Sequence, residues 1–401
     1  MIAVAVFLAT YLVMALGRLP GYRLDRAGAA LLGGGLMVAF GVLNLSQAYA
    51  AIDMRTITLL LGVMIVVANL RLSGFFRLAT TFVVARARHP LALFVAVVAV
   101  AGFLSAFLVN DTVCLVMTPL VLDLVTRLKR RPVPYLLAVA MASNAGSVAT
   151  ITGNPQNMII GAFSHLTYFQ FVSALAPVAV VALVLTTLLI ALMHRDEFFV
   201  RDRLEPPTPR PVRYHRGLVI KTLVVTCAMV VLFFSGLPVA PVAILAGAAL
   251  LMTRRVKPEK VYFDIDWPLL VMFAGLFIVV AGLEKAVIGP DAVAAIGKLN
   301  LAAVPLLSLA TALLSNLVSN VPAVLVLRPF VAGFADPDHA WLVVAMASTL
   351  AGNFALVGSV ANLIVVERAR REGVPISFWS YFRVGAPLTV LTIAFGAWWL
   401  S

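Results

Sequence analysis

The sequence predicts an all-α polytopic membrane protein made of two inverted repeats, and three observations support this prediction. Of its 401 residues, 62% are hydrophobic and only 12% are charged, whereas soluble domains have about 45–50% apolar and about 25% charged residues. Apolar runs near the roughly 20 residues that cross a bilayer recur along the chain. Motifs of the first half reappear in the second. Soluble globular folds are therefore excluded.

We expect ten full spans, five in each half. They lie near residues 2–17, 28–45, 56–72, 135–165, 172–193, 217–235, 239–253, 267–283, 340–366 and 379–400. The first apolar run has no basic segment before it, so we interpret it as a retained span and not as a cleaved signal peptide. The triple Gly33-Gly34-Gly35 has no apparent counterpart in the second half, and we interpret it as a helix-packing site.

Two further apolar stretches, 91–126 and 302–331, are interrupted midway by polar residues. The interruptions are Asn110-Asp111-Thr112 and Ser319-Asn320. Each stretch is long enough for two short helices but short for two full spans. We interpret both as re-entrant hairpins, because irregular backbone at membrane depth is tolerated only inside protein or beside a water-filled cavity.

Charge placement fixes the expected orientation. With both termini outside the plasma (inner) membrane, only Arg55, Lys285, Lys298 and Arg328 of the 30 basic residues fall outside. This asymmetry follows the positive-inside rule. The net charge of +13 comes from basic residues in the short loops on the inside. Because these loops account for the charge, we expect no nucleic-acid partner.

The repeat is visible in three sets of matched residues. Ile52-Asp53 matches Ile265-Asp266 at a spacing of 213 residues. The hairpins and the spans after them supply the other matches, namely Ser105 and Asn110 with Ser315 and Asn320, and Gly153 and Asn157 with Gly358 and Asn362. Because five spans is an odd number, the second copy is inverted relative to the first. We expect repeats at 1–195 and 217–401, joined by a cytoplasmic linker at 196–216.

The spans 135–165 and 340–366 are predicted to be broken in the middle, because Gly153 and Pro155 disfavour a continuous helix. A break frees carbonyls that can bind a cation, and the start of the second half-helix can hold an anion. Asp111 is the intramembrane acid without an obvious partner, which favours a functional role. The structural alternative for Asp111 is that its side chain caps the following helix. The structural alternative for the breaks is that their small residues allow close helix packing.

These hairpin tips and breaks supply the candidate substrate- and ion-binding residues, since inverted repeats with broken helices place such a site between the halves. The candidates are Ser105, Asn110, Asp111, Thr112, Thr152, Gly153, Asn154, Asn157, Ser315, Ser319, Asn320, Asn353, Gly358, Ser359 and Asn362. We find no nucleophile–base constellation and no metalloprotease motif, so we expect no enzyme activity and no cofactor.

At these residues the chain resembles the ion-transporter superfamily, which includes divalent-anion:sodium symporters, citrate carriers, arsenite-efflux permeases and one class of sodium/proton antiporters. The resemblance covers nearly the whole chain. It implies a scaffold domain and a mobile transport domain in a homodimer that works as an elevator. It also implies possible sodium sites at Ser105, Asn110, Asp111 and Gly153 in the first half, and at Ser315, Ser319, Asn320 and Gly358 in the second.

The resemblance therefore implies a secondary active transporter of a small anionic or inorganic substrate, coupled to sodium or protons. The symporters carry Ser-Asn-Thr at each tip, whereas this chain has Val109-Asn110-Asp111 at the first tip. An Asn-Asp pair looks more like the arsenite-efflux and antiporter branches, with Asp111 as the coupling carboxylate. A channel with similar hairpins is the alternative from another class.

Overall fold

The structure is a computed structural model of the chain and describes all residues except 18–20, 80–87, 201–203, 205–213 and 288–301. All regular secondary structure in the described residues is helical. The all-α prediction is thus confirmed. Most of the predicted linker 196–216 lies outside the described residues, as does Lys298.

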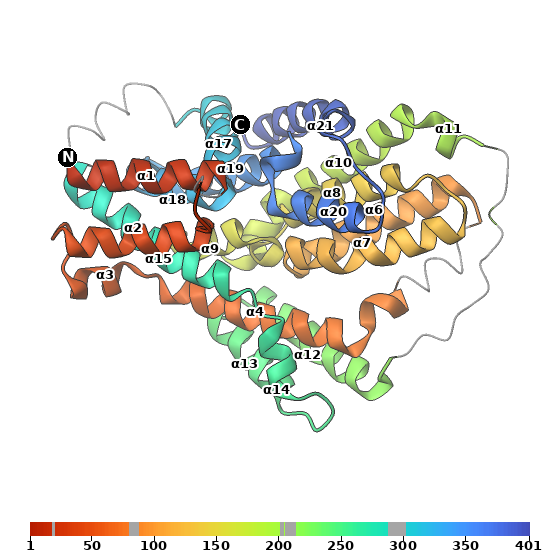
Figure 1. Cartoon of the computed structure of the whole chain (residues 1–401), viewed down its shortest axis with the longest axis horizontal. Coiled ribbons are helices and arrows are strands. Elements are labelled where there is room, and N and C mark those ends of the chain that lie inside the picture. Colours follow the sequence, from red (N-terminus) through yellow and green to blue (C-terminus); the bar gives the residue numbers. More distant parts are fainter. Residues whose placement is uncertain (18–20, 80–87, 201–203, 205–213, 288–301) are drawn as a thin grey trace.

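The same series of helices occurs twice along the chain (Figure 1). The first series is α1 (Ile2–Leu16), α2 (Arg26–Ala39), α3 (Leu45–Ala51), α4 (Met54–Ser73), α6 (Pro90–Phe107), α7 (Asn110–Arg127), α8 (Pro132–Ser147), α9 (Pro155–Phe163) and α10 (Tyr168–Met193). After the short α11 (Arg195–Phe198), the second series is α12 (Arg216–Phe234), α13 (Val239–Leu251), α14 (Pro258–Phe263), α15 (Trp267–Val287), α17 (Val304–Val318), α18 (Asn320–Val331), α19 (Pro337–Ala351), α20 (Val360–Arg371) and α21 (Phe378–Trp399).

Six of the described helices are long and apolar enough to cross a membrane. They are α4, α6, α10, α12, α15 and α21. The sequence did not anticipate that α6, the first arm of a predicted hairpin, would reach this length. It also did not predict the short helices α3 and α14, because an apolar-run criterion overlooks helices of seven and six residues.

Two crossed helix pairs hold the first part of each series together. In this group, which we call the scaffold unit (α1–α4 and α12–α15), α2 packs against α15 and α4 against α13. A Cβ atom added to Gly62 would lie 2.5 Å from the carbonyl carbon of Ala243, and one added to Gly275 would lie 2.4 Å from that of Ala30. Only glycine permits this approach, and the two contacts are equivalent in the two repeats.

Gly34 takes part in the same arrangement. An added Cβ there would lie 3.3 Å from the carbonyl oxygen of Gly275, and one at Gly247 would lie 3.2 Å from that of Gly62. Gly34 and Gly247 are 213 residues apart. The packing role predicted for the glycine triple fits this contact, but the expectation that it lacks a counterpart is wrong for Gly34. The repeat is detectable there only once the contacts are known.

The remaining helices form a second group, the hairpin unit (α6–α10 and α17–α21). Helices α6 and α7 are antiparallel arms joined at residues 108–109, and α17 and α18 are joined at Ser319. Behind the arms, α8 and α19 are buried almost throughout. The predicted broken spans are indeed interrupted, by 3₁₀ turns at Ile151–Gly153 and Leu356–Gly358. Pro155 at the first turn of α9 explains why a new helix starts there.

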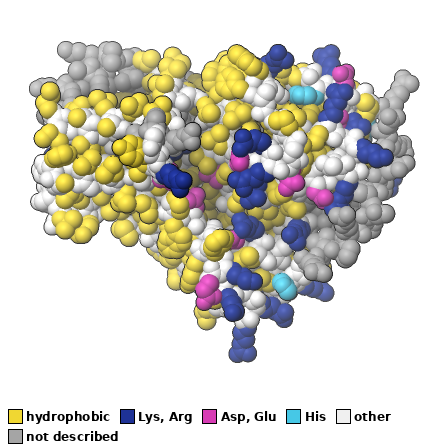
Figure 2. All heavy atoms as spheres, in the orientation of Figure 1, with side chains coloured by type: hydrophobic (Ala, Val, Ile, Leu, Met, Phe, Trp, Pro, Cys, Tyr) yellow, Lys and Arg dark blue, Asp and Glu magenta, His cyan; other side chains and the backbone are white. Residues whose placement is uncertain are grey.

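Basic side chains are unevenly spread over the surface. Figure 2 shows Lys and Arg gathered on the lower and right-hand parts of the visible face, toward α14 and α11, while the left-hand part is mainly hydrophobic.

Candidate functional site

Four helices of the hairpin unit begin at one cavity of about 180 Å³, which we call the tip cavity. The lining residues at these helix starts are Asn110 and Asp111 (α7), Pro155 and Gln156 (α9), Ser319 to Val321 (α18), and Ser359 and Val360 (α20). Backbone N–H groups in the first turn of a helix have no partner within the helix, and the helix dipole is positive there. The cavity thus collects donors from both hairpin tips and both breaks.

The scaffold unit supplies the opposite wall, with most of the charge. Arg26 lines the cavity and donates a hydrogen bond from Nε to the carbonyl oxygen of Met14 at 3.1 Å. Asp25 accepts from the Gly28 amide at 2.8 Å, and Asp266 accepts from the Leu269 amide at 3.1 Å, so both carboxylates cap scaffold helices. No ion pair between described residues includes Arg26 or Asp111. Both side chains line the cavity and can contact a solute there.

The equivalent serines of the hairpins hold the two tips differently. Ser105 Oγ lies 2.7 Å from Ser143 Oγ, and Ser143 Oγ donates to the Asn110 carbonyl oxygen at 3.0 Å. In the second repeat, Ser315 Oγ donates directly to Asn320 Oδ1 at 2.6 Å. Ser319 has a φ of +80°, a left-handed conformation that non-glycine residues rarely adopt. The second tip is therefore a strained turn, and the hydroxyl of Ser315 holds the side chain of Asn320.

Asn144 on α8 joins the two repeats. Its Oδ1 accepts from Asn110 Nδ2 at 3.0 Å and from Ser359 Oγ at 3.2 Å. Its Nδ2 donates to Asn353 Oδ1 at 2.9 Å and to Asn362 Oδ1 at 3.1 Å. One buried amide thus fixes the first tip against the second break.

Thr349 on α19 plays the reciprocal part, 205 residues after Asn144. Its Oγ1 accepts from Asn154 Nδ2 at 3.2 Å and from Gln156 Nε2 at 3.1 Å. Asn154 also donates to Ser147 Oγ at 3.0 Å. Each repeat therefore places one polar side chain into the break of the other.

Four carbonyl oxygens at the breaks accept hydrogen bonds from asparagine side chains. Asn157 Nδ2 donates to the carbonyl oxygens of Ser147 and Thr150, at 3.1 and 2.9 Å. Asn362 Nδ2 donates to those of Gly352 and Ala355, at 2.7 and 3.3 Å. The two asparagines support the breaks from behind. The buried Oδ1 of Asn110 instead has no hydrogen-bond partner among the described residues, and Asn110 lines the tip cavity.

The predicted site residues thus occupy three positions. Those that line the tip cavity are Asn110, Asp111, Ser319, Asn320 and Ser359. Those buried beneath it in the polar network are Ser105, Asn154, Asn157, Ser315, Asn353 and Asn362. Those that do not line it are Thr112, Thr152, Gly153 and Gly358. Thr152 bonds Tyr168 at 2.9 Å, and a Cβ on Gly153 would lie 2.2 Å from the Ser147 carbonyl oxygen.

Sequence reasoning missed Arg26, Asp266, Gln156, Asn144 and Thr349. Asn144 and Gln156 belong to the polar break segment, so their composition was a usable signal. The Asp53–Asp266 match pointed to a repeated position without indicating that Asp266 faces the hairpin tips. Arg26 gave no signal, because it was counted among the loop arginines.

A smaller cavity of about 100 Å³, the inner cavity, adjoins the tip cavity, because Asp111, Asp266 and Leu269 line both. Thr112, Arg71 and Asp264 complete its polar lining. Arg71 Nη2 lies 2.6 Å from Asp264 Oδ1, while Oδ2 of Asp264 is buried without a partner in the described residues. Burial raises the pKa of Asp264, and the adjacent Arg71 acts in the opposite direction.

Comparisons with known proteins agree with this architecture. A family described as "Citrate transporter" matches residues 10–351. An uncharacterized transporter of Mycobacterium tuberculosis is 31% identical, over 100% of this chain and 97% of its own. The silicon efflux transporter LSI3 of Oryza sativa subsp. japonica is 30% identical, over 94% of this chain and 92% of its own.

Among solved structures, the YdaH transporter of Alcanivorax borkumensis superposes with a TM-score of 0.62 at 15% identity, covering 100% of this chain and 96% of that one. This likeness confirms the fold. The family match covers far more than half of the sequence. The chain is therefore a membrane transporter that belongs to the citrate transporter family.

Proposed function

We propose that the protein is a secondary active transporter of a small oxygen-bearing anion and that the tip cavity is its substrate site. The convergence of four helix starts on a single cavity supports this proposal most directly. Their N–H groups and the Arg26 guanidinium are suited to carboxylate or oxyanion oxygens. A volume of about 180 Å³ restricts the substrate to a small solute.

Asp111 is the proposed coupling group, through a proton or a sodium ion. It lies on the first turn of α7, where it faces the tip cavity and the inner cavity together. Asn110 Oδ1 is the neighbouring oxygen without a partner, so an amide and a carboxylate oxygen are available to a cation. A carboxylate in this position binds or releases the cation according to which cavity is open.

Export of a weak oxyacid by antiport is the second candidate. The tip cavity has one guanidinium against the three acidic side chains Asp25, Asp111 and Asp266, a balance that favours a neutral, hydroxyl-rich solute over an anion. The similar protein of Oryza sativa is named a silicon efflux transporter. In this second candidate, the proton or sodium ion carried by Asp111 crosses the membrane in the direction opposite to the solute.

An elevator movement would shift the hairpin unit past the scaffold unit, and we propose it in a homodimer of the plasma membrane with both termini outside. The division of the helices into two groups that meet at the tip cavity supports this movement. The gathering of basic residues toward one end supports the orientation. Transport without chemical conversion of the solute, and without a cofactor, completes the proposal.

Solute counterflow into proteoliposomes tests the function. Citrate, arsenite and silicic acid are offered in turn, with a proton gradient, a sodium gradient or neither. We expect saturable counterflow of one solute class and acceleration by one gradient. A channel would give neither saturable flux nor coupling to a gradient. Absence of counterflow for all three solutes under every gradient would reject the proposed substrate classes.

Asn320→Ala tests the site. We expect loss of counterflow with a folded protein, because the Ser315 hydroxyl, once Asn320 Oδ1 is removed, still has the Ser348 carbonyl oxygen as an acceptor at 3.1 Å. Size-exclusion chromatography and thermal unfolding in detergent are the folding controls. Normal counterflow by Asn320→Ala would mean that the substrate binds elsewhere.

A further inference from the structure

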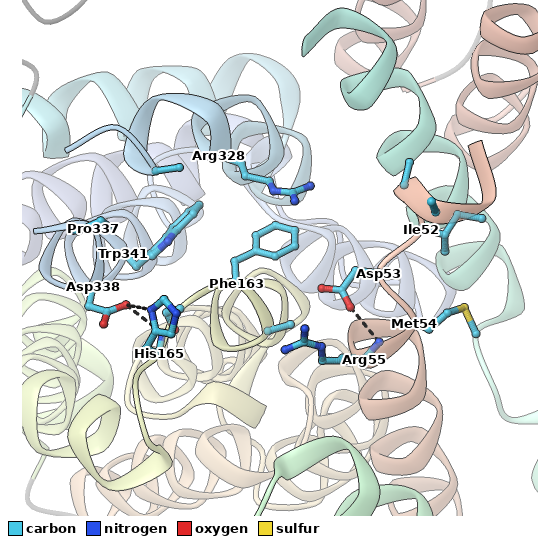
Figure 3. Close-up of a pocket in the computed structure, with 15 residues that line it drawn as sticks. Ile52, Asp53, Met54, Arg55, Phe163, His165, Arg328, Pro337, Asp338 and Trp341 are labelled. Atoms are coloured by element: carbon cyan, nitrogen blue, oxygen red, sulfur yellow. Dashed lines mark hydrogen bonds and ion pairs between the residues drawn. The ribbon is translucent and has the colours of Figure 1, made fainter. Parts of the chain in front are cut away.

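A third and larger cavity, which we call the vestibule, lies between the scaffold and hairpin units and shares no lining residue with the tip or inner cavities. Its volume is about 700 Å³. The segment 50–55 before and at the start of α4 forms one wall, and the ends of α9 and α18 with the start of α19 form the other (Figure 3). Nothing in the transport cycle proposed above assigns a role to it.

Two arginines face the vestibule from different units. Arg55 comes from α4 of the scaffold unit, and Arg328 from α18 of the hairpin unit; Figure 3 shows them on opposite sides of Phe163. The Arg328 guanidinium carbon lies 4.3 Å from the centre of the Phe163 ring, which orients its plane. Among the ion pairs between described residues, none includes Arg55 or Arg328.

The two carboxylates of the vestibule, in contrast, are already hydrogen-bonded to backbone amides. Asp53 Oδ1 accepts from the amides of Arg55 and Thr56, at 2.8 and 3.3 Å. Asp338 Oδ1 accepts from the His165 amide at 2.9 Å and lies 3.7 Å from the His165 ring nitrogen Nδ1. The two guanidinium groups are therefore the charged donors that this lining offers to a solute.

The repeat supplies an independent reason to expect a ligand here. Asp53, in the vestibule wall, is the counterpart of Asp266, which lines the tip cavity. On its scaffold side, the vestibule is thus lined by the first-repeat equivalent of a position that faces the hairpin tips in the second repeat. The two arginines add to this equivalent place a pair of donors suited to oxyanions.

We infer that the vestibule is a second anion site, in which Arg55 and Arg328 bind carboxylate or oxyanion oxygens of one solute from the two units. Guanidinium groups bind such oxygens through paired hydrogen bonds. The oxyanion can come from a free solute or from the phosphate of a lipid headgroup, because Arg55 is exposed. This inference concerns binding and does not require the tip cavity to be the substrate site.

Trp341 lines the vestibule and can report on binding there. The protein is labelled with 5-fluorotryptophan, placed in neutral phosphatidylcholine nanodiscs and titrated with citrate or inorganic phosphate; Trp341→Phe identifies the signal. A parallel sample in nanodiscs with phosphatidylglycerol, without added solute, tests the lipid source. We expect a saturable shift of the Trp341 ¹⁹F signal with solute, or a shifted signal in the anionic lipid alone.

Arg55→Gln and Arg328→Gln should each weaken binding about tenfold, the equivalent of one lost charge-assisted contact. Arg254→Gln, at an exposed position away from the vestibule, should leave the midpoint unchanged. Arg328→Lys keeps the charge but loses the paired hydrogen bonds of a guanidinium group. Its binding midpoint should therefore lie between those of the unsubstituted protein and Arg328→Gln. If Arg328→Gln does not fold, the titration of Arg55→Gln is sufficient to test the inference, because Arg55 is exposed and its substitution disturbs no packing.

Three results would overturn the inference. They are a Trp341 signal unaffected by both solutes and by anionic lipid, unchanged midpoints in the arginine variants, and loss of the shift in Asn320→Ala, which would place the anion in the tip cavity. A shift that survives Asn320→Ala while counterflow is lost supports the vestibule site and the proposed function together. A shift in a protein without counterflow of any solute retains the vestibule site alone.

Discussion

Asn144 and Thr349 show how a single side chain can join two inverted repeats. They occupy equivalent positions, yet Asn144 uses both ends of its amide for four partners, whereas Thr349 accepts from two amides with one hydroxyl. All of these groups are buried. In a buried setting, a polar atom that loses its partner costs more than the hydrogen bond contributed. The network therefore favours one mutual arrangement of the two breaks.

Thr349→Val should lower the free energy of unfolding by about 1–3 kcal/mol, because the buried Gln156 amide loses its acceptor and Asn154 keeps only those of Ser147. Thermal unfolding in detergent measures the loss. The matched control is Thr187→Val, whose hydroxyl bonds only the Leu183 carbonyl oxygen of its own helix at 2.8 Å. Equal unfolding temperatures for both variants would contradict the cross-repeat role.

Asp111→Asn should preserve the fold and abolish coupling, because it keeps the shape of the side chain and removes its charge. Gradient-driven uptake is measured in proteoliposomes at several pH values and sodium concentrations. Asp123→Asn on the same helix is the control, since Asp123 is exposed and pairs with Arg127 at 2.6 Å. If Asp111→Asn remains coupled to the gradient, Asp111 is only a helix-start residue and neutral oxygens hold the cation.

At the scale of the helices, the close contacts of α4 with α13 and of α15 with α2 depend on glycine. Gly62→Ala should destabilise the protein by about 1–3 kcal/mol, because its Cβ must push the backbone of α13 away. Gly35→Ala is the control: a Cβ there meets nothing within 4 Å, so the better helix propensity of alanine should raise stability by up to about 1 kcal/mol. Thermal unfolding of the two variants should move in opposite directions.

The helices show how far the sequence determines the site. The hairpin tips and both breaks were predictable because polar residues, glycine and Pro155 interrupt apolar runs at matched spacings. The scaffold wall was not, because Arg26 and Asp266 reach the cavity only through the packing of α2 against α15. Thr152 shared the polar run of the first break, but its hydroxyl bonds Tyr168 on α10. Composition identifies a polar segment, and packing decides which of its side chains face the cavity.

At the scale of the whole molecule, a sliding hairpin unit should expose its tips to both sides of the membrane. Ser319→Cys, in a background where Cys114 and Cys227 are replaced, places a thiol in the tip cavity. We expect a membrane-impermeant maleimide to label it from either side, with rates that change with the solute gradient. Ser235→Cys at the exposed end of α12 should be labelled from one side only. Labelling of position 319 from a single side under all gradients would contradict the elevator movement.

The reciprocal glycine contacts also bear on how the chain is made. Since α2 needs α15 and α4 needs α13, neither pair can form until the ribosome has synthesised well over half of the protein. Until then, the glycine-bearing faces of α2 and α4 lack the partners that they contact in the folded protein. The same dependence constrains ancestry, because a half-length precursor would have lacked both partners. Such a precursor would have needed a second, oppositely inserted copy of itself, and fusion of the two genes would have made that encounter obligatory.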